Sequence, residues 1–434
     1  MAGFDKLKLN KQLIKSATEA GYAVPKEIQQ KTLTRIIGGQ DIIAIAPEGF
    51  GKTTAYILGT LNRFNYSPEG VPKVLILVPE KEDVLAVIEQ FELLNKNNSI
   101  AIVGLYVTPG TEAQMDALAD GADIVVATPD RARAIYLKLA LNLNKMELLI
   151  IDDADRMIKK GMQLPITELA NSIGKCQHLV FTDVMHSRIE KLVAPFMNLP
   201  AIIEVEALEE SPVKTHQQLL YNVPNFPTKV NLLNLFMYDE EVFTKAVVFV
   251  NKQATAEKVF QSLNRRIQDA VGYFKPRFFD VKGFNTVADF KAEADARVLI
   301  VVTENEDAIE LDGIPFLIHF DLPADKETYI QRVTNNNTNS EDETLALTFA
   351  TDLDLSLVKR IEQATGKKMQ PAALPDDLVI VNDVKPKATP TKQSTKTTEP
   401  ETGAAFHEKK ASNNKNYNFS SGQKAKMNMK KKHG

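Results

Sequence analysis

Several features that mark other classes of protein are missing from this sequence. It has no tryptophan and a single cysteine in 434 residues, so an intramolecular disulfide is excluded and a reducing compartment is expected. No apolar run opens the chain or reaches the length of a bilayer span, which argues against a signal peptide or a membrane anchor. Because 44% of the residues are apolar and 25% are charged, we expect a globular protein. The lone cysteine and the lack of a signal peptide or anchor lead us to expect a cytoplasmic one.

Net charge is nearly absent as well, since 52 basic and 56 acidic residues leave −4 at pH 7. That value argues mildly against a nucleic-acid partner, but it averages two different regions. Residues 385–434 hold twelve lysines and three acidic residues, a net charge of +9, so residues 1–384 carry −13. The tail has few apolar residues and is expected to be disordered, because it cannot bury enough surface to offset its ordering entropy.

Short apolar runs separated by helix-length segments dominate residues 1–384. Such runs are typical of strands buried on both faces of a parallel sheet, so they predict an α/β fold. They form two series on either side of an acidic stretch at residues 204–212, which predicts two domains. The predicted strands are residues 41–46, 74–78, 100–103, 124–127, 148–151 and 179–181 in the first series, and residues 219–223, 246–250, 298–302, 316–320 and 345–349 in the second.

The strongest local motif follows the first predicted strand, where residues 46–54 read APEGFGKTT. A strand, a glycine-rich loop, a lysine and a helix in this order predict a phosphate-binding loop. Its glycines let backbone N–H groups approach phosphate oxygens, its lysine supplies positive charge, and the next threonine can bind Mg²⁺. A chance match on a surface turn is the alternative, which the flanking strand and helix disfavour. The predicted nucleotide-binding residues here are Gly49, Phe50, Gly51, Lys52, Thr53 and Thr54.

A pair of carboxylates ends the strand predicted at residues 148–151. A carboxylate at the C-terminal end of a strand faces the ligand crevice of an α/β sheet. Asp152 is therefore predicted to hold Mg²⁺ with Thr53, while Asp153 and Lys52 are the predicted catalytic residues, Asp153 as the base that orients a water. The alternative is an acidic helix N-terminus stabilised by the helix dipole.

Together these motifs resemble the DEAD-box RNA helicases over roughly residues 4–370. Residues 21–29 (GYAVPKEIQ) are similar to the family's adenine-reading Q motif, with Phe4 at the expected position upstream, and residues 152–157 (DDADRM) stand where the family has its eponymous motif. The resemblance implies two tandem RecA-like P-loop domains, ATP and Mg²⁺ as cofactors and RNA as partner. It also implies that Phe4 and Gln29 help to bind the nucleotide.

Further motifs imply contacts with the RNA backbone and a second domain. Residues 127–131 (ATPDR) are similar to the family's RNA-gripping T-P-G-R loop, and residues 78–82 (VPEKE) to its P-T-R-E-L element. Residues 247–251, 298–323 and 329–333 align with motifs IV, V and VI. The residues that the resemblance assigns to RNA are Lys81, Thr128, Pro129 and Arg131.

The implied organisation has four parts. An N-terminal RecA-like ATP-binding domain covers residues 1–207, a linker 208–215, a C-terminal RecA-like domain with degenerate motifs 216–384, and the disordered lysine-rich tail 385–434. Lysines of the tail alternate with aromatic residues, which suits sequence-independent contact with phosphates and bases. A merely solubilising tail is the alternative.

The sequence departs from the family pattern where the family hydrolyses ATP or couples hydrolysis to movement. An arginine finger, for example, contributes about 10³- to 10⁵-fold in rate, and neutral side chains cannot replace it. The departures are Asp153 for the catalytic glutamate, residues 182–184 (TDV) for S-A-T, Thr303 and Asp307 for the aspartate and arginine of motif V, and Asn335 and Thr338 for the arginine fingers of motif VI. We therefore expect retained ATP binding and weak hydrolysis.

Three functions stay open at this point. The first is an ATP-dependent RNA helicase or remodeller, and the second is a non-hydrolysing ATP- and RNA-binding clamp or assembly factor. The third, a P-loop ATPase that acts on protein, is disfavoured by Gln29 and by Thr128 with Pro129. No metal other than Mg²⁺ is expected, and the identity of the RNA, the catalytic competence and the oligomeric state are left open.

Overall fold

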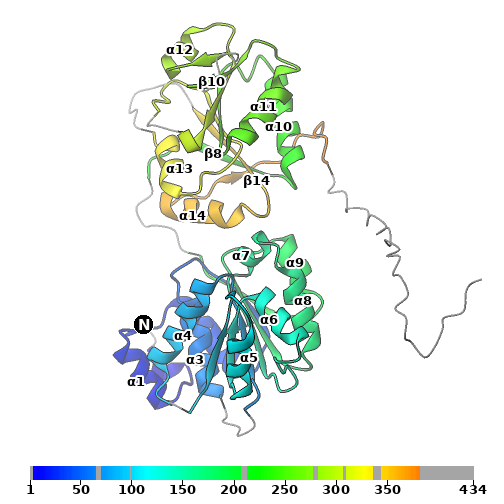
Figure 1. Cartoon of the computed structure of the whole chain (residues 1–434). Helices are drawn as coiled ribbons and strands as arrows, with labels where there is room; N and C mark the ends of the chain where they lie inside the picture. Colours follow the sequence, from blue (N-terminus) through cyan, green and yellow to red (C-terminus); the bar gives the residue numbers. More distant parts are fainter. Residues whose placement is uncertain are drawn as a thin grey trace, which may run out of the picture. The chain divides into compact units, whose positions relative to one another are not determined.

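Two parallel β-sheets flanked by helices organise the chain (Figure 1). The computed structural model describes residues 3–64, 70–97, 99–206, 213–276, 282–305, 309–335 and 344–381. The predicted α/β fold with two parallel sheets is confirmed. Most of the predicted linker, Asp307, Thr338 and the tail lie outside the described residues, and the predicted domain boundaries stay predictions.

The first sheet has the strand order β3-β4-β2-β5-β6-β1-β7, and all its neighbours are parallel. Its strands are β1 (Ile42–Ile45), β2 (Val74–Leu77), β3 (Ile102–Leu105), β4 (Ile124–Ala127), β5 (Leu148–Ile151), β6 (Gln177–Thr182) and β7 (Ala201–Glu204). The interior strands β1, β2, β4 and β5 are apolar along their whole length because both of their faces are covered. The interior strand β6 is buried throughout but carries polar residues at both of its ends. In β1, Ile42 and Ala44 enter one hydrophobic cluster while Ile43 and Ile45 enter another on the opposite face.

Helices cover both faces of this sheet (Figure 1). They are η1 (Phe4–Lys6), α1 (Lys11–Glu19), α2 (Glu27–Ile37), α3 (Lys52–Arg63), α4 (Lys81–Leu94), α5 (Glu112–Ala119), α6 (Pro129–Leu137), α7 (Ala154–Lys159), α8 (Gln163–Ser172) and α9 (Ser187–Val193). Local sequence sets several starts: Asn10 accepts a hydrogen bond from the Leu13 N–H at 2.8 Å, and Pro129 opens α6. Within the described ranges, no helix is long and apolar enough to cross a membrane.

The second sheet has the order β11-β10-β12-β9-β13-β14-β8-β15 and is also parallel. Its strands are β8 (Gln217–Asn222), β9 (Ala246–Val250), β10 (Val271–Phe274), β11 (Gly283–Phe284), β12 (Val298–Val302), β13 (Phe316–His319), β14 (Leu345–Ala350) and β15 (Gln370–Pro371). Its helices are α10 (Phe226–Tyr238), α11 (Gln253–Asn264), α12 (Val287–Ala292), η2 (Thr303–Asn305), α13 (Lys326–Val333) and α14 (Leu355–Thr365). As in β1, alternate residues of β9 enter two clusters on opposite faces.

The predicted strands all occur, and four further strands were missed. β7, β11 and β15 lie at sheet edges, where one side of the strand is unpaired and a long apolar run is not needed. β10 is interior, but Gly272 interrupts its apolar pattern. β3 spans Ile102–Leu105 rather than residues 100–103.

A buried imidazole joins β6 to the start of β1 and makes stability depend on pH. His178 contacts the Asp41 carboxylate through Nδ1 at 3.2 Å, and its backbone N–H donates to the same group at 2.8 Å. Burial lowers the pKa of His178, but hydrogen bonds with Asp41 and Cys176 outweigh burial and raise this pKa to about 9. A raised histidine pKa stabilises the fold fully below its ordinary value near 6.5, and this stabilisation is lost as the pH rises through about 9.

We expect Asp41→Asn to lower the free energy of unfolding by about 1 kcal/mol at pH 6, after discounting for solvent screening. At pH 9.5 the deficit relative to wild type should largely disappear, because His178 is then neutral in both proteins. Asparagine keeps an oxygen for the His178 N–H, so the substitution tests the charge. Urea unfolding followed by far-UV circular dichroism measures it, and equal deficits at both pH values would contradict the assignment.

Candidate functional site

The strand order of the first sheet gathers the predicted site residues along one edge. Because all strands are parallel, their carboxyl ends lie on the same side of the sheet. The order β5-β6-β1 places the loop after β1 beside Asp183 and Asp152, which follow β6 and β5. The order β3-β4-β2 places Thr128 beside the loop that leads to Lys81. The predicted nucleotide-binding and RNA-binding residues therefore lie along the carboxyl ends of the strands, in two neighbouring halves of the sheet. The two halves meet where β5 pairs with β2.

The loop after β1 has the backbone of a phosphate cradle. Gly49 and Gly51 have φ values of 79° and 84°, a left-handed conformation that favours glycine. At Gly51 a Cβ atom would also overlap with the side chain of Gln29. The 12-residue helix α3 begins at Lys52, so the unpaired N–H groups of its first turn lie next to this loop and can bind an anion.

The predicted adenine-binding glutamine is fastened to this loop. Gln29 Oε1 accepts from the Lys26 N–H at 2.9 Å, and Gln29 Nε2 donates to the Gly51 carbonyl at 3.2 Å. The Lys26 ammonium donates to the Gly49 carbonyl. An amide has two donor hydrogens and two acceptor lone pairs, so these contacts use half of the capacity of Gln29. The glutamine can thus hold the loop and still meet a base edge.

Three other predicted nucleotide-binding side chains pack into the first domain. Phe4 is buried in the hydrophobic cluster on one face of the sheet, and Phe50 is half-buried against the same cluster. Thr54 is buried, and its hydroxyl accepts a hydrogen bond from Gln90 Nε2 at 3.1 Å, which joins α3 to α4. The assignment of these three residues to the nucleotide stays a prediction.

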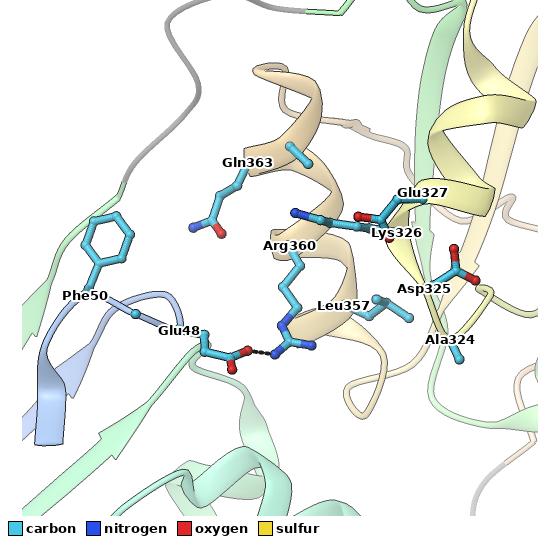
Figure 2. Close-up of a pocket in the computed structure, with 11 residues that line it drawn as sticks. Glu48, Phe50, Ala324, Asp325, Lys326, Glu327, Leu357, Arg360 and Gln363 are labelled. Atoms are coloured by element: carbon cyan, nitrogen blue, oxygen red, sulfur yellow. Dashed lines mark ion pairs between the residues drawn. The ribbon is translucent and has the colours of Figure 1, made fainter. Parts of the chain in front are cut away.

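The exposed side of the loop borders a pocket that α13 and α14 also line (Figure 2). Leu357, Arg360 and Gln363 lie on one face of α14, and Arg360 forms an ion pair with Glu48 of the loop. Glu48 is an acidic side chain within a sequence that is expected to bind phosphate. The contact with Arg360 neutralises it.

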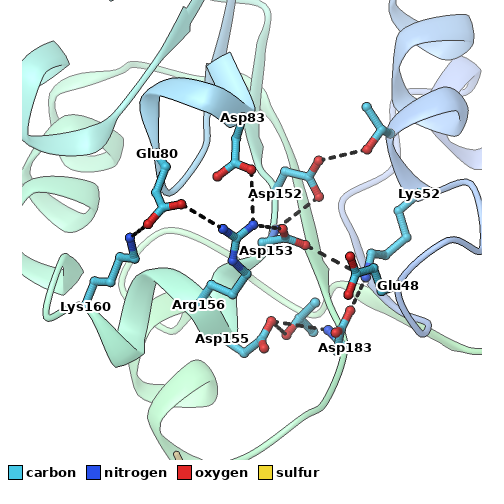
Figure 3. A network of polar contacts seen from close by, with 12 residues as sticks. Glu48, Lys52, Glu80, Asp83, Asp152, Asp153, Asp155, Arg156, Lys160 and Asp183 are labelled. Carbon is cyan, nitrogen blue, oxygen red and sulfur yellow. Dashed lines mark hydrogen bonds and ion pairs between the residues drawn. The ribbon is translucent and has the colours of Figure 1, made fainter. Parts of the chain in front are cut away.

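Lys52 lies at the centre of a buried polar network (Figure 3). Its ammonium donates to the Ala46 carbonyl at 2.8 Å, forms an ion pair with Asp183 and lies 3.9 Å from Asp153 Oδ1. Burial lowers the pKa of Lys52, but the carboxylates of Asp183 and Asp153 outweigh burial and raise this pKa above its ordinary value. The lysine is therefore charged, and Asp183 is its principal partner.

The residues predicted to hold Mg²⁺ fit that ion. Thr53 Oγ1 and Asp152 Oδ2 are 3.3 Å apart, close to the separation of about 3 Å between adjacent ligands that lie roughly 2.1 Å from an octahedral ion. Burial, followed by the charge of Asp153, raises the pKa of Asp152, and a bound cation would favour its ionised form. Because Mg²⁺ usually keeps several waters and substrate oxygens, Thr53 and Asp152 would suffice to hold it, and it would supply a charge that polarises the phosphates.

Asp153, the predicted base, is itself held by an arginine (Figure 3). Arg156 Nη1 donates to Asp153 Oδ2 at 2.8 Å and to Asp83 at 3.2 Å, while Nη2 lies 3.4 Å from Glu80. Lys160 pairs with Glu80 as well. Asp153 has a φ of 52°, in the left-handed region. Its carboxylate is oriented by Arg156 and balanced by Arg156 and Lys52 together.

The predicted RNA-binding residues lie at the other half of the edge. Thr128 and Pro129 begin α6, and both are buried. Arg131 donates to Gln114 Oε1 at 2.7 Å and to Thr108 Oγ1 at 2.9 Å, so it shapes the segment after β3. Lys81 is exposed and lies 5.4 Å from the ring of Tyr106. Of these four residues, the lysine presents the most accessible charge.

In the second sheet, the positions aligned with motifs V and VI form a local packing cluster. The Arg332 guanidinium lies 4.0 Å from the centre of the Phe249 ring, and its Nη2 donates to Thr303 Oγ1 at 3.1 Å. The Thr303 hydroxyl donates to the Val250 carbonyl at 3.0 Å. Asn335 donates its backbone N–H to the Lys214 carbonyl at 3.0 Å. Thr303 and Arg332 thus join β12 to α13.

Sequence reasoning missed two sets of partners. Asp153 and Arg156 are three residues apart at the start of a helix, a spacing that brings two side chains together. This contact could therefore have been predicted from the sequence. The pairing of Lys52 with Asp183 joins residues 131 positions apart, and no local pattern indicates it. It requires β6 to lie next to β1.

The fold and the site together define a P-loop nucleotide-binding protein built on two parallel α/β sheets. Residues 26–192 match the model of the DEAD/DEAH box helicase family. The "RNA helicase CrhR" of Synechocystis is 28% identical over 381 residues, which cover 86% of this chain and 75% of the relative. The "ATP-dependent RNA helicase eIF4A" of Candida albicans is 26% identical over 370 residues, which cover 83% of this chain and 89% of the relative. Residues 26–192 thus resemble a DEAD/DEAH box helicase domain, and the chain as a whole is similar to proteins named as RNA helicases.

A solved structure is also similar. The crystal structure of a DEAD box protein from Methanococcus jannaschii is 21% identical, covers 86% of this chain and 99% of its own, and has a TM-score of 0.48. The fold assignment itself rests on the strand order and register described above.

Proposed function

We propose that the chain is an ATP-dependent RNA helicase or RNA remodeller that binds ATP with Mg²⁺ in its first domain and RNA backbone across both domains. The observation that carries this proposal is the shared sheet edge. The phosphate loop with Asp152 and Asp153 occupies the ends of β1 and β5, and the RNA-binding candidates occupy the ends of β2 and β4. A nucleotide and an RNA backbone at adjacent strand ends can influence each other through the strands and loops between them.

We further propose that hydrolysis is weak. A general base must lie within hydrogen-bond reach of the attacking water. Asp153 is one methylene shorter than the family's glutamate, and Arg156 holds one of its oxygens. Asn335 and Thr338 replace the family's arginine fingers, which contribute about 10³- to 10⁵-fold in rate. These differences act on turnover and leave the phosphate loop intact.

The same observations favour a second candidate, a clamp that binds ATP and RNA without hydrolysis. In such a protein ATP serves as a structural ligand. The tail, residues 385–434, lies outside the described residues, and in either function its lysines add sequence-independent attraction for phosphates.

RNA-stimulated ATPase activity and strand displacement, measured on one preparation, test these proposals. We expect turnover well below the range of roughly 1 to 10³ s⁻¹ that is typical of enzymes, with slight stimulation by excess single-stranded RNA. Asp153→Asn serves as the control for contaminating ATPase. Slow ATP-dependent displacement supports the remodeller, whereas ATP-dependent RNA binding without displacement supports the clamp.

Two outcomes would contradict the proposals. Turnover of several per second that disappears in Asp153→Asn would refute weak hydrolysis. Both candidate functions would be refuted if the protein bound no ATP and its affinity for RNA did not change when ATP was added.

A further inference from the structure

Asp183 occupies the position from which an anion neutralises Lys52. It follows β6, which lies between β5 and β1, and its carboxylate forms an ion pair with the lysine ammonium (Figure 3). The two side chains are 13% and 7% exposed, respectively. A lysine at the end of a phosphate loop is expected to pair with the outer phosphates of a nucleotide. In this structure the Lys52 ammonium is paired with the carboxylate of Asp183.

The position of Asp183 is well defined by its surroundings. Its backbone N–H donates to Asp155 Oδ1 at 3.3 Å, and the neighbouring Thr182 hydroxyl donates to the same oxygen at 3.0 Å. The same hydroxyl lies 2.9 Å from the Val184 carbonyl oxygen, so its one hydrogen is shared between these two acceptors. These contacts fix the turn after β6, so the backbone position of Asp183 is well defined. Moving away from Lys52 would leave a largely buried carboxylate without its main partner, which is costly.

The charges near the lysine are predominantly negative. Lys52 is one positive charge next to the carboxylates of Asp152, Asp153 and Asp183, and all three interact with it electrostatically. Burial raises the pKa of Asp183 more than Lys52 lowers it, so the carboxylate gains less than full compensation from the pair. An outer phosphate that approaches Lys52 must displace Asp183 or share the ammonium with it. Repulsion between the phosphate and the carboxylate opposes either arrangement.

We propose that Asp183 is a specificity-determining residue: a built-in anion that competes with the outermost phosphate for Lys52 and so lowers the affinity for nucleoside triphosphates relative to diphosphates. The inference rests on the proposed nucleotide binding at this loop. A diphosphate places less negative charge near Asp183 than a triphosphate does. The competitor therefore weakens triphosphate binding more strongly than diphosphate binding.

Isothermal titration calorimetry with ADP and with the β,γ-imido analogue of ATP, both in excess Mg²⁺, tests this competition. The proteins are wild type, Asp183→Asn, Asp183→Ala and the control Asp116→Asn, which removes one charge from an exposed carboxylate on α5. We expect Asp183→Asn to raise the affinity for the triphosphate analogue about tenfold and that for ADP less than twofold. Asp183→Ala should act in the same direction, and Asp116→Asn should change neither affinity.

The outcomes separate this inference from the proposed function. Equal changes for the two nucleotides, or no change in Asp183→Asn with an intact circular dichroism spectrum, would overturn the role of Asp183 while leaving the nucleotide site in place. Asparagine has nearly the volume of aspartate, so it keeps the packing even if alanine destabilises the domain. If neither nucleotide bound to any of the four proteins, the proposed nucleotide site itself would be refuted, and the inference with it.

Discussion

Lys52→Ala is expected to weaken ATP binding roughly 100-fold, the upper range for loss of a charge-assisted hydrogen bond. The substitution removes the positive charge next to the phosphate loop and leaves the carboxylates of Asp152, Asp153 and Asp183 without it. Both changes disfavour the binding of the negatively charged phosphates of ATP. Titration of labelled ATP into wild type and variant measures the effect.

A double substitution separates the ammonium from the carboxylate that it leaves behind. In the Asp183→Asn background, Lys52→Ala removes the ammonium while no charge remains at position 183. We expect this double variant to bind ATP at least about tenfold more weakly than Asp183→Asn alone. The phosphate loop would be ruled out as a nucleotide site by two results together. The double variant would bind ATP as tightly as Asp183→Asn, and Lys52→Ala would bind it as tightly as wild type.

Truncation after Val384 is expected to weaken RNA binding roughly 100-fold near 0.1 M salt. The tail carries a net +9 while the rest of the chain carries −13, so truncation removes the chain's main positive region. For single-stranded nucleic acid the logarithm of affinity falls by about 0.7 per phosphate contact for each tenfold rise in salt. If four or five lysines contact phosphates, the slope should fall by roughly 3 on truncation. Fluorescence anisotropy at several salt concentrations measures both quantities.

A matched variant distinguishes charge from length and stacking. Replacing the twelve tail lysines by glutamine keeps the chain length and the aromatic residues Phe406, Tyr417 and Phe419. We expect this variant to lose the same slope as the truncated chain and to retain a part of the affinity through base stacking. An unchanged slope in both variants would identify the tail as a solubilising segment.

Much of the fold could be predicted because its strands are buried on both faces. A strand such as β5, with four consecutive buried apolar residues, is visible in the sequence as an uninterrupted run. β7 is an edge strand with one buried residue, and β10 contains Gly272; neither shows such a run. The phosphate loop was equally visible, because its glycines, lysine and threonine are consecutive and their spacing reflects backbone geometry.

The interior of the site was harder to predict. Asp183 was recognised as a charged residue at a position that the family keeps small, but its partner was not. Arg156 holds Asp153 at a spacing of three residues, which sequence reasoning could have used. Phe4 and Thr54 were assigned to the nucleotide from motif position; both are buried, and their role in nucleotide binding stays a prediction.

The sequence by itself determined the α/β class, the two series of strands, the phosphate loop and the uneven distribution of charge. Each of these depends on residues close together in the chain or on simple composition. Only the tertiary structure decided which charges meet. Lys52 and Asp183 are 131 residues apart, and they form a pair because β6 lies beside β1 and their carboxyl ends share one edge. Strand order is a property of long-range packing, so the residue that competes for the phosphate-loop lysine could be identified only in the folded chain.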